Sequence, residues 1–170
     1  MKLSEGVEWG LHILLTLAWL GDQEPVPAAK LAASHDLPAA YLNKHLQALS
    51  RAGLLTSQPG PRGGFTLARP PEQISLLDVA EAIDGSQGAF RCSEIRRRGM
   101  GESLPARCFE GPCAINAVMQ SADAAWREVL ARHSIADIRG TVDEHAPEAA
   151  GVARRLFDRD PGSASRSRSR

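Results

Sequence analysis

The segment that most constrains the fold is a helical stretch that leads directly into a glycine- and proline-rich hairpin. Residues 38–52 carry leucines at three- and four-residue steps, which is the spacing of one helix face. Gly53 is suited to end that helix. Residues 54–68 hold two short strand-like runs around the tip QPGPRGG, which predicts a two-stranded antiparallel hairpin. The apolar helix face consists of Leu42, Leu46 and Leu49.

Two further helices are predicted before this unit. Residues 3–20 carry apolar side chains at helical spacing after Ser4, a favoured N-cap type. A short helix is expected from about residue 27, where a proline lacks an N–H that the first turn does not need. Three helices followed by a hairpin make a winged helix-turn-helix, so the predicted fold class is mainly α with a small β-hairpin wing. Another short helix at 74–83 completes a domain predicted over residues 1–85.

The remainder of the chain is predicted to form three parts. Residues 86–112 lose all periodicity and are rich in Gly, Pro and Arg, which predicts a cysteine-bearing loop. Residues 113–145 are predicted to hold one long helix and a short final helix. Residues 146–170 end in GSASRSRSR and are predicted to form a disordered basic tail. The apolar stripe of the long helix consists of Ile115, Val118, Met119, Ala122, Ala125, Trp126, Val129 and Leu130.

Composition excludes several classes of protein. The chain has 170 residues, 43% of them hydrophobic, which allows a buried core and argues against wholesale disorder. No apolar run approaches the ~18 residues that a membrane span needs. The apolar stretch near the start carries His12 and lacks a small-residue cleavage site, so no signal peptide is expected. The expected location is cytoplasmic, with no membrane partner.

The formal net charge is zero, but the charges are segregated along the sequence. Residues 37–71 carry four basic residues and no acidic one, whereas residues 72–148 have a net charge of −5. Phosphates repel carboxylates and attract Lys and Arg, so a surface that binds double-stranded DNA benefits from an acid-free segment. Because the acid-free segment coincides with the predicted helix and hairpin, these two elements are the candidate DNA-binding face.

The polar positions of residues 38–52 include side-chain types that read base edges. Asn43, Gln47 and Arg51 have amide and guanidinium groups that pair with bases in the major groove. The start of such a helix usually enters the groove, and an arginine at a wing tip can reach a minor groove or a phosphate. The same pattern also fits an ordinary solvated helix face beside a hairpin. The candidate DNA-contacting residues are Tyr41, Asn43, Lys44, Gln47, Arg51 and Arg62.

Three cysteines, Cys92, Cys108 and Cys113, fall within 22 residues. An odd number of cysteines in a cytoplasmic chain argues against a disulfide framework. Their spacing, C-x15-C-x4-C, lacks the CxxC pairs of a zinc finger. Cys113 stands at a predicted helix start, where the helix dipole favours the thiolate. The three thiols are therefore either idle or members of one metal or redox site.

A second group of candidate ligands lies in the first predicted helix. Glu8 and His12 are four residues apart, so their side chains point to one side of that helix. Leu15 and Trp19 continue the same side, which suggests a half-buried face. A carboxylate and an imidazole at this spacing can bind one metal ion, and they also fit an ordinary surface pair.

Together these residues resemble the IscR/NsrR-type winged-helix regulators of the Rrf2 family. The resemblance runs from residue 1 to about residue 142. Its motifs follow one another in the same order as in that family. They are MKLSEGVEWGLHIL at the start, YLNKHLQALSRAGLL in the predicted recognition helix, GPRGGFTLARP in the wing, ISLLDVAEAIDG after it and PCAINAVM at the start of the long helix.

The resemblance implies a homodimeric transcription regulator, commonly a repressor, that uses the long helix for dimerisation. Members of the family often hold a [2Fe–2S] cluster through three loop cysteines and a fourth ligand, which in some members comes from the partner's first helix. By this resemblance Cys92, Cys108 and Cys113 match the loop ligands, and Glu8 matches the fourth ligand.

The cysteine spacing departs from the common family pattern, near C-x5-C-x5-C, because the first gap here is far longer. His12 is an added candidate that makes the chain look more like the redox-sensing RsrR branch, in which Glu and His ligands join cysteines. The implied ligands are Glu8 and His12 from one subunit and two cysteines from the other, with one cysteine spare. Histidine ligation raises the potential of such clusters, which favours redox sensing. Trp9, beside Glu8, is either a redox relay or an ordinary core or interface aromatic.

Three alternatives to an iron–sulfur regulator remain open on the sequence. The first is a thiol or disulfide switch without metal, and the second is a structural zinc site. The third is an enzyme or electron carrier, although the sequence contains no nucleophile–base pair, phosphate-binding loop or cofactor fingerprint. The chain is therefore not expected to be an enzyme or to have a small-molecule substrate.

Overall fold

The first helix, α1 (Glu5–Leu20), forms the centre of the molecule because it is apolar around most of its circumference. Ten of its sixteen residues are buried, so other helices must cover it on several sides. The helices that pack against it are α3 (Ala39–Arg51), α4 (Leu76–Asp84), α6 (Ile135–His145) and α7 (Glu148–Asp158). This computed structural model describes residues 3–21, 24–88 and 90–158.

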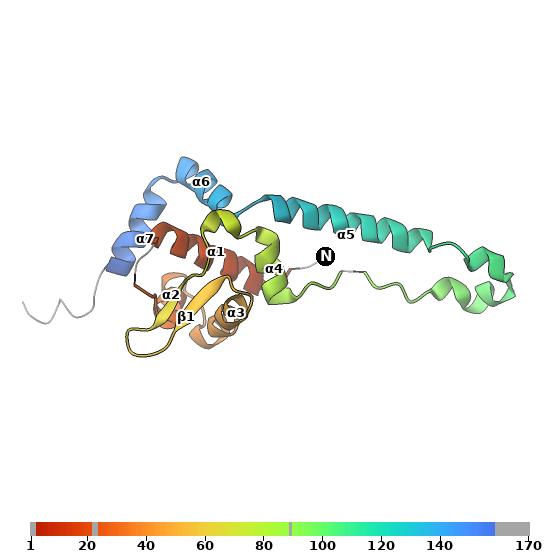
Figure 1. Ribbon diagram of the computed structural model, residues 1–170, viewed down its shortest axis with the longest axis horizontal. Coiled ribbons are helices and arrows are strands. Elements are labelled where there is room, and N and C mark those ends of the chain that lie inside the picture. Colours follow the sequence, from red (N-terminus) through yellow and green to blue (C-terminus); the bar gives the residue numbers. More distant parts are fainter. Residues whose placement is uncertain (1–2, 22–23, 89, 159–170) are drawn as a thin grey trace, which may run out of the picture.

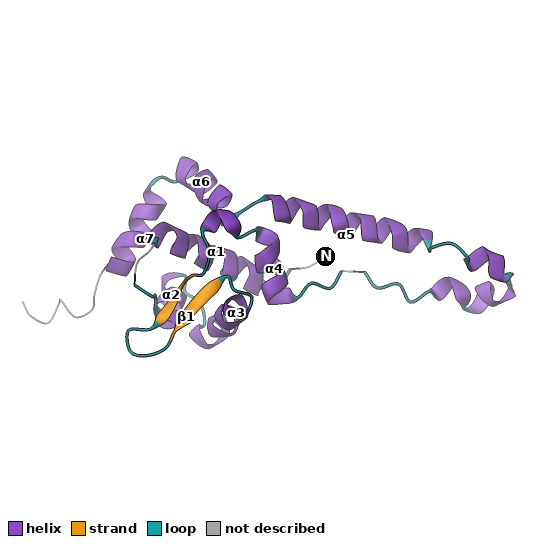
Figure 2. Ribbon diagram, in the orientation of Figure 1, coloured by secondary structure: helices purple, strands orange, loops and turns teal. Residues whose placement is uncertain are grey.

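The predicted helix-plus-hairpin unit is confirmed, and the fold is mainly helical with one antiparallel hairpin (Figure 2). A short helix, α2 (Ala28–Ser34), precedes α3, and β1 (Leu55–Gln58) pairs with β2 (Gly64–Leu67). Val26 extends the hairpin through two backbone hydrogen bonds with Phe65, at 2.9 and 3.0 Å. Gly64 allows this approach, since a Cβ there would lie 2.3 Å from the carbonyl carbon of Val26.

The core of the described residues lies between α1, α2, α3 and the hairpin. The predicted apolar face of α3 is fully buried, which confirms that pattern. Ile135 extends the core into α6, and its N–H donates to the carbonyl of Ile74 at 2.9 Å. The largest fully buried side chains are Ile13, Leu14, Leu31, Leu42, Leu46, Leu49, Leu54, Ile74, Ile135, Val7 and Val79.

Residues 85–88 and 90–113, together with α5 (Ala114–Arg132), form an arm that runs out from the body and returns to it (Figure 1). Cys113 is the N-cap residue of α5, which confirms the predicted helix start. The outward segment was predicted to lack structure, and this was partly wrong. It contains three short 3-10 helices, because backbone N–H groups bond to carbonyls three residues back. They are η2 (Ile95–Arg97), η3 (Gly99–Ser103) and η4 (Ala106–Phe109).

The prediction of a disordered tail over residues 146–170 was wrong for its first half, where α7 forms. Phe157 of α7 packs against the core, and the ammonium of Lys30 donates to the Phe157 carbonyl at 2.5 Å. Arg154 donates to the carbonyl of Trp19 at 3.1 Å, which satisfies a free acceptor at the end of α1. The segment GSASRSRSR lies outside the described residues.

In the part of the chain that is described, no helix combines the length and the apolar character that crossing a membrane requires.

Candidate functional site

The candidate DNA-contacting residues are all exposed. Four of them share the solvent-facing side of α3, opposite its buried leucines. The hairpin lies next to α3, and Arg62 is at the exposed turn between its strands (Figure 1). These two elements therefore present basic and amide side chains without a carboxylate between residues 37 and 71. The four residues on that side of α3 are Asn43, Lys44, Gln47 and Arg51.

His45 differs from these polar residues of α3, because it is only 7% exposed. Its ring contacts the rings of both Trp9 of α1 and Tyr41 of α3. Burial and the nearby Lys44 ammonium lower the pKa of His45, and the Asp84 carboxylate acts in the opposite direction. Periodicity alone could have indicated burial, since residue 45 falls beside the leucine face of this helix.

Glu8 and His12 are exposed on α1 and line one shallow groove of about 320 Å³. The half-buried face predicted for this side of the helix is found farther along it. Leu15 is buried there, and the half-buried Trp19 donates its indole N–H to Asp143 at 2.8 Å. The two candidate ligands thus share one solvent-accessible patch.

His35 is a neighbour of this groove that the sequence did not reveal. Its ring centroid lies 6.0 Å from that of His12, and its Nε2 is 3.1 Å from the hydroxyl of Thr16. That hydroxyl in turn donates to the carbonyl of His12 at 2.9 Å. Burial lowers the pKa of His35, and the charge of His12 lowers it further.

Two of the three cysteines interact on the arm. The N–H of Asn116 lowers the pKa of Cys113, and the N–H of Ile115, the Cys92 thiol and the Arg96 guanidinium act in the same direction. Cys92 also accepts a hydrogen bond from the N–H of Glu94 at 3.4 Å. These contacts favour a thiolate at Cys113.

Arg96 is held beside the two thiols by several groups. It pairs with the Glu94 carboxylate, donates to the carbonyl of Gly111 at 2.7 Å and lies 5.6 Å from the ring centroid of Phe109. Cys108 belongs to η4, is exposed and is not among the groups that act on Cys113. Cys92 is thus the one other cysteine that acts on the pKa of Cys113 among the described residues.

The predicted metal ligands do not meet within one chain. Among the described residues, no three or more His, Cys, Asp or Glu side chains gather as a metal ion requires. Glu8 and His12 lie on the body, whereas Cys92 and Cys113 lie on the arm (Figure 1). We call these two pairs the α1 half-site and the arm half-site.

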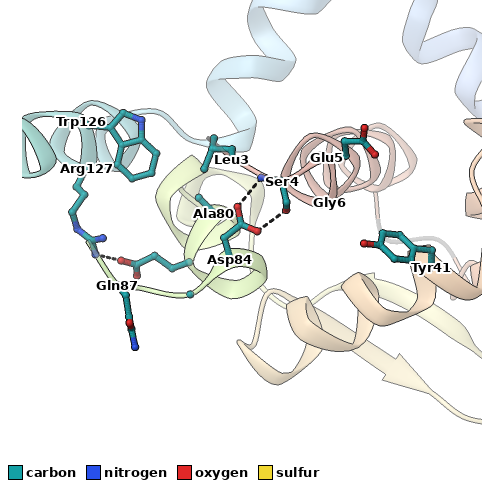
Figure 3. Close-up of a pocket in the computed structure, with 12 residues that line it drawn as sticks. Leu3, Ser4, Glu5, Gly6, Tyr41, Ala80, Asp84, Gln87, Trp126 and Arg127 are labelled. Carbon is teal, nitrogen blue, oxygen red and sulfur yellow. Dashed lines mark hydrogen bonds and ion pairs between the residues drawn. The ribbon is translucent and has the colours of Figure 1, made fainter. Parts of the chain in front are cut away.

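A cleft of about 760 Å³ lies where the arm meets the body (Figure 3). Trp126 and Arg127 of α5 line it on one side, and Tyr41 of α3 lines it on the other. Arg127 pairs with Glu81 of α4, which also lines the cleft. No sequence pattern indicates this cleft, because its walls come from segments that are far apart along the chain.

A family model matches this chain over most of its length. It is Rrf2, described as an iron-dependent transcriptional regulator, and it covers residues 3–140. The chain belongs to the Rrf2 family. This Rrf2 protein is 30% identical over 146 residues to YwgB of Bacillus subtilis, whose name describes an HTH-type transcriptional regulator. That match covers 85% of this chain and 88% of YwgB.

Other relatives of this Rrf2 protein also carry the names of regulators. IscR of Aliivibrio salmonicida is 32% identical over 92 residues, which cover 54% of this chain and 55% of that protein. Among solved structures, T. potens IscR has a TM-score of 0.64 at 23% identity, over 86% of this chain and 91% of that one. CymR, the global cysteine regulator of B. subtilis, has a TM-score of 0.61 at 23% identity. That match covers 83% of this chain and 98% of CymR. These two likenesses show a shared fold, and the names of the relatives agree with a regulator rather than an enzyme.

Proposed function

We propose that this Rrf2 protein is a homodimeric DNA-binding repressor whose DNA affinity depends on a redox-responsive [2Fe–2S] cluster between its subunits. The observation that carries the proposal is the division of the candidate ligands into an α1 half-site and an arm half-site. A carboxylate, an imidazole and two thiolates supply the four protein ligands of such a cluster. Because the half-sites lie apart in one chain, we expect the partner subunit to supply the complementary one.

The surface of α5 supports a dimer. None of its residues is buried in the described chain, and Ile115, Val118 and Val129 are each more than half exposed. An apolar stripe of this length is unfavourable in water unless another surface covers it. A second α5 offers the same stripe and so fits a two-fold contact. Val118→Glu is expected to give monomers in size-exclusion chromatography with light scattering, while Gln120→Glu, at an exposed polar position, leaves the dimer intact.

The exposed side of α3 and the wing tip support contact with double-stranded DNA. Lys44, Arg51 and Arg62 supply positive charge for phosphates, and Asn43 and Gln47 have the groups that read bases. Tyr41, at the start of α3, completes the proposed contact set.

The chemistry of both half-sites fits the cluster. Cys113 is favoured as a thiolate, and Cys92 lies beside it, which leaves Cys108 as the spare thiol. Glu8 and His12 are accessible to a partner's arm. When bound, the cluster supplies a one-electron redox change. Glu8 and His12 would then connect α1 to the partner's arm, and Trp9 next to Glu8 would relay changes to Tyr41, whose ring centroid lies 5.5 Å away.

Anaerobic purification with iron and sulfide analysis, visible spectroscopy and DNA binding in both redox states tests the proposal. The expected result is a coloured protein with equal iron and sulfide whose DNA affinity differs between the two states. Glu8→Ala and His12→Ala should each alter the visible spectrum, whereas Cys108→Ser should leave it unchanged. A colourless, iron-free protein would exclude the cluster.

A metal-free thiol switch is the second candidate, and the Cys92–Cys113 interaction favours it. Two thiols that lose two electrons and two protons to an oxidant form a disulfide. The fold is shared with the oxidised form of Staphylococcus aureus CymR, at a TM-score of 0.59 and 24% identity. Mass spectrometry of unreduced peptides would detect a Cys92–Cys113 link, and zinc analysis would reveal a structural zinc site instead.

A further inference from the structure

His45 is a buried histidine whose presence packing stability does not explain. Its side chain is 7% exposed, and its Nε2 atom has no hydrogen-bond partner among the described residues. A buried polar atom without a partner destabilises the folded state, and a leucine would fill similar space without that cost. The position therefore uses a property of the imidazole that leucine lacks, namely its flat ring.

The ring of His45 packs against α1 at Gly6. A Cβ on Gly6 of α1 would lie only 2.3 Å from the His45 Cε1 atom, so this glycine and this ring fit one another. The centroid of the Trp9 ring is 5.9 Å from that of His45, with an interplanar angle of 89°. The Tyr41 centroid is 5.2 Å away, at 72°.

Trp9 and Tyr41 also contact each other directly, with centroids 5.5 Å apart and an interplanar angle of 75°. All three contacts are edge-to-face, which is a favoured arrangement of aromatic rings. We call Trp9, Tyr41 and His45 the three-ring cluster. It joins two helices that carry different parts of the proposed function.

The three-ring cluster connects the α1 half-site to the DNA-facing end of α3. Trp9 follows Glu8 directly in α1. Tyr41 is 52% exposed near the start of α3, and the start of such a helix usually enters the major groove. His45 lies one turn after Tyr41, and its ring occupies the space that a Cβ at position 6 would need. Because His45 contacts both rings while these rings also contact each other, the relative positions of Trp9 and Tyr41 depend on the packing of His45.

We propose that His45 is a positioning residue that couples Trp9 to Tyr41, so that the state of the α1 half-site sets the DNA affinity of α3. The inference rests on the proposed function, because it takes the Glu8–His12 end of α1 as the sensing end. His45 acts through Tyr41, and its role requires no contact of its own with DNA.

A double-mutant cycle in the full-length, metal-free protein tests this coupling. The probe is a DNA duplex that the wild-type protein enriches from a random-sequence library. Trp9→Leu is expected to weaken DNA binding roughly three- to tenfold in the wild-type background. The same change should have no further effect once His45→Leu is present. Additive effects of the two substitutions would overturn the proposal.

His45→Phe is the matched variant, because it keeps a flat ring and removes the unpaired nitrogen. It is expected to preserve the effect of Trp9→Leu, and loss of that effect would overturn the proposal. His133→Leu, at an exposed histidine of the described chain, should change neither binding nor the cycle. Thermal denaturation identifies any variant that fails to fold. If His45→Leu does not fold, His45→Gln takes its place, since it also removes the ring.

The cluster-loaded protein separates this inference from the proposed function. The ratio of DNA affinities between the two redox states should fall toward one in His45→Leu and persist in His45→Phe. A ratio that persists in His45→Leu overturns the role of His45 and leaves the redox function standing. A wild-type protein that holds no cluster overturns the redox function, and the metal-free cycle then decides whether the two helices are coupled.

Discussion

Ser4 and Asp84 are joined by two hydrogen bonds that tie the start of α1 to the end of α4 (Figure 3). The Ser4 N–H donates to Oδ2 at 2.9 Å, and its hydroxyl donates to Oδ1 at 2.5 Å. Ser4 is the N-cap residue of α1, yet its hydroxyl does not cap that helix. Asp84 is the last residue of α4, so this contact fixes the base of the arm beside the helix that carries Glu8 and His12.

Removal of the Asp84 carboxylate is expected to lower stability. Asp84→Ala removes both bonds and should reduce the free energy of unfolding by about 1–2 kcal/mol. Ser4→Ala keeps the backbone bond and should have a smaller effect. Urea denaturation measures both, with Glu144→Ala, at an exposed carboxylate of α6, as the control. If Asp84→Ala and Ser4→Ala are as stable as the Glu144→Ala control, this contact does not stabilise the fold.

Substitutions on α3 should separate phosphate contacts from base contacts. Lys44→Ala is expected to weaken binding to all DNA sequences. It should also make the plot of log affinity against log salt concentration less steep, by about 0.9 for each phosphate contact that is lost. Gln47→Ala should cost about 1–3 kcal/mol only on the preferred sequence. Fluorescence anisotropy over a salt series distinguishes the two effects. Arg132→Ala, at the exposed end of α5, should change neither quantity, and an equal effect there would argue against the α3 face.

The thiol of Cys113 should react faster than that of Cys108 in metal-free protein. The lowered pKa of Cys113 increases its thiolate fraction near neutral pH, so its alkylation rate should reach a plateau below the pH at which an ordinary thiol does. Arg96→Ala removes one of the stabilising charges and should move the plateau to higher pH. Mass spectrometry of iodoacetamide-treated protein measures both rates. Equal rates at the two cysteines across the pH range would contradict the assignment.

Acidification should destabilise the fold through His35 and His45. Burial holds the pKa of each below the ordinary value of 6.5. As the pH falls through about 6.5, the unfolded chain therefore binds more protons than the folded chain does. The free energy of unfolding decreases over this pH range. His45→Phe should flatten this pH dependence in thermal denaturation. A slope unaffected by His45→Phe would show that other groups cause the destabilisation.

The helix α7 is expected to stabilise the body although it lies at the end of the described chain. Phe157→Ala should lower the free energy of unfolding by about 1–2 kcal/mol, because a partly buried ring leaves the core. Val152→Ala, on the exposed side of α7, should stay within about 0.5 kcal/mol of wild type. Thermal denaturation compares the two, and equal melting temperatures would mean that α7 does not contribute.

The elements with strong local patterns could be predicted from the sequence. The leucine face of α3, the glycine-rich turn and the helix start at Cys113 depend on neighbours within a few residues, so spacing alone reveals them. The prediction for residues 146–158 was wrong although α7 is amphipathic, because it grouped this helix with the basic tail, and α7 packs on the body through contacts with Lys30 and Trp19. Such contacts lie more than a hundred residues apart in sequence and leave no local signal.

The candidate site likewise combines features that the sequence predicts with features that depend on tertiary packing. The sequence by itself determined the residue types: an acid-free helix and wing, three cysteines, and the Glu8–His12 pair at helical spacing. Only the tertiary structure decided that Cys92 lies with Cys113, that this pair stands apart from α1, and that His45 is buried against Trp9 and Tyr41. Periodicity fixes which side of a helix a residue occupies, whereas its neighbours across space depend on how the helices pack.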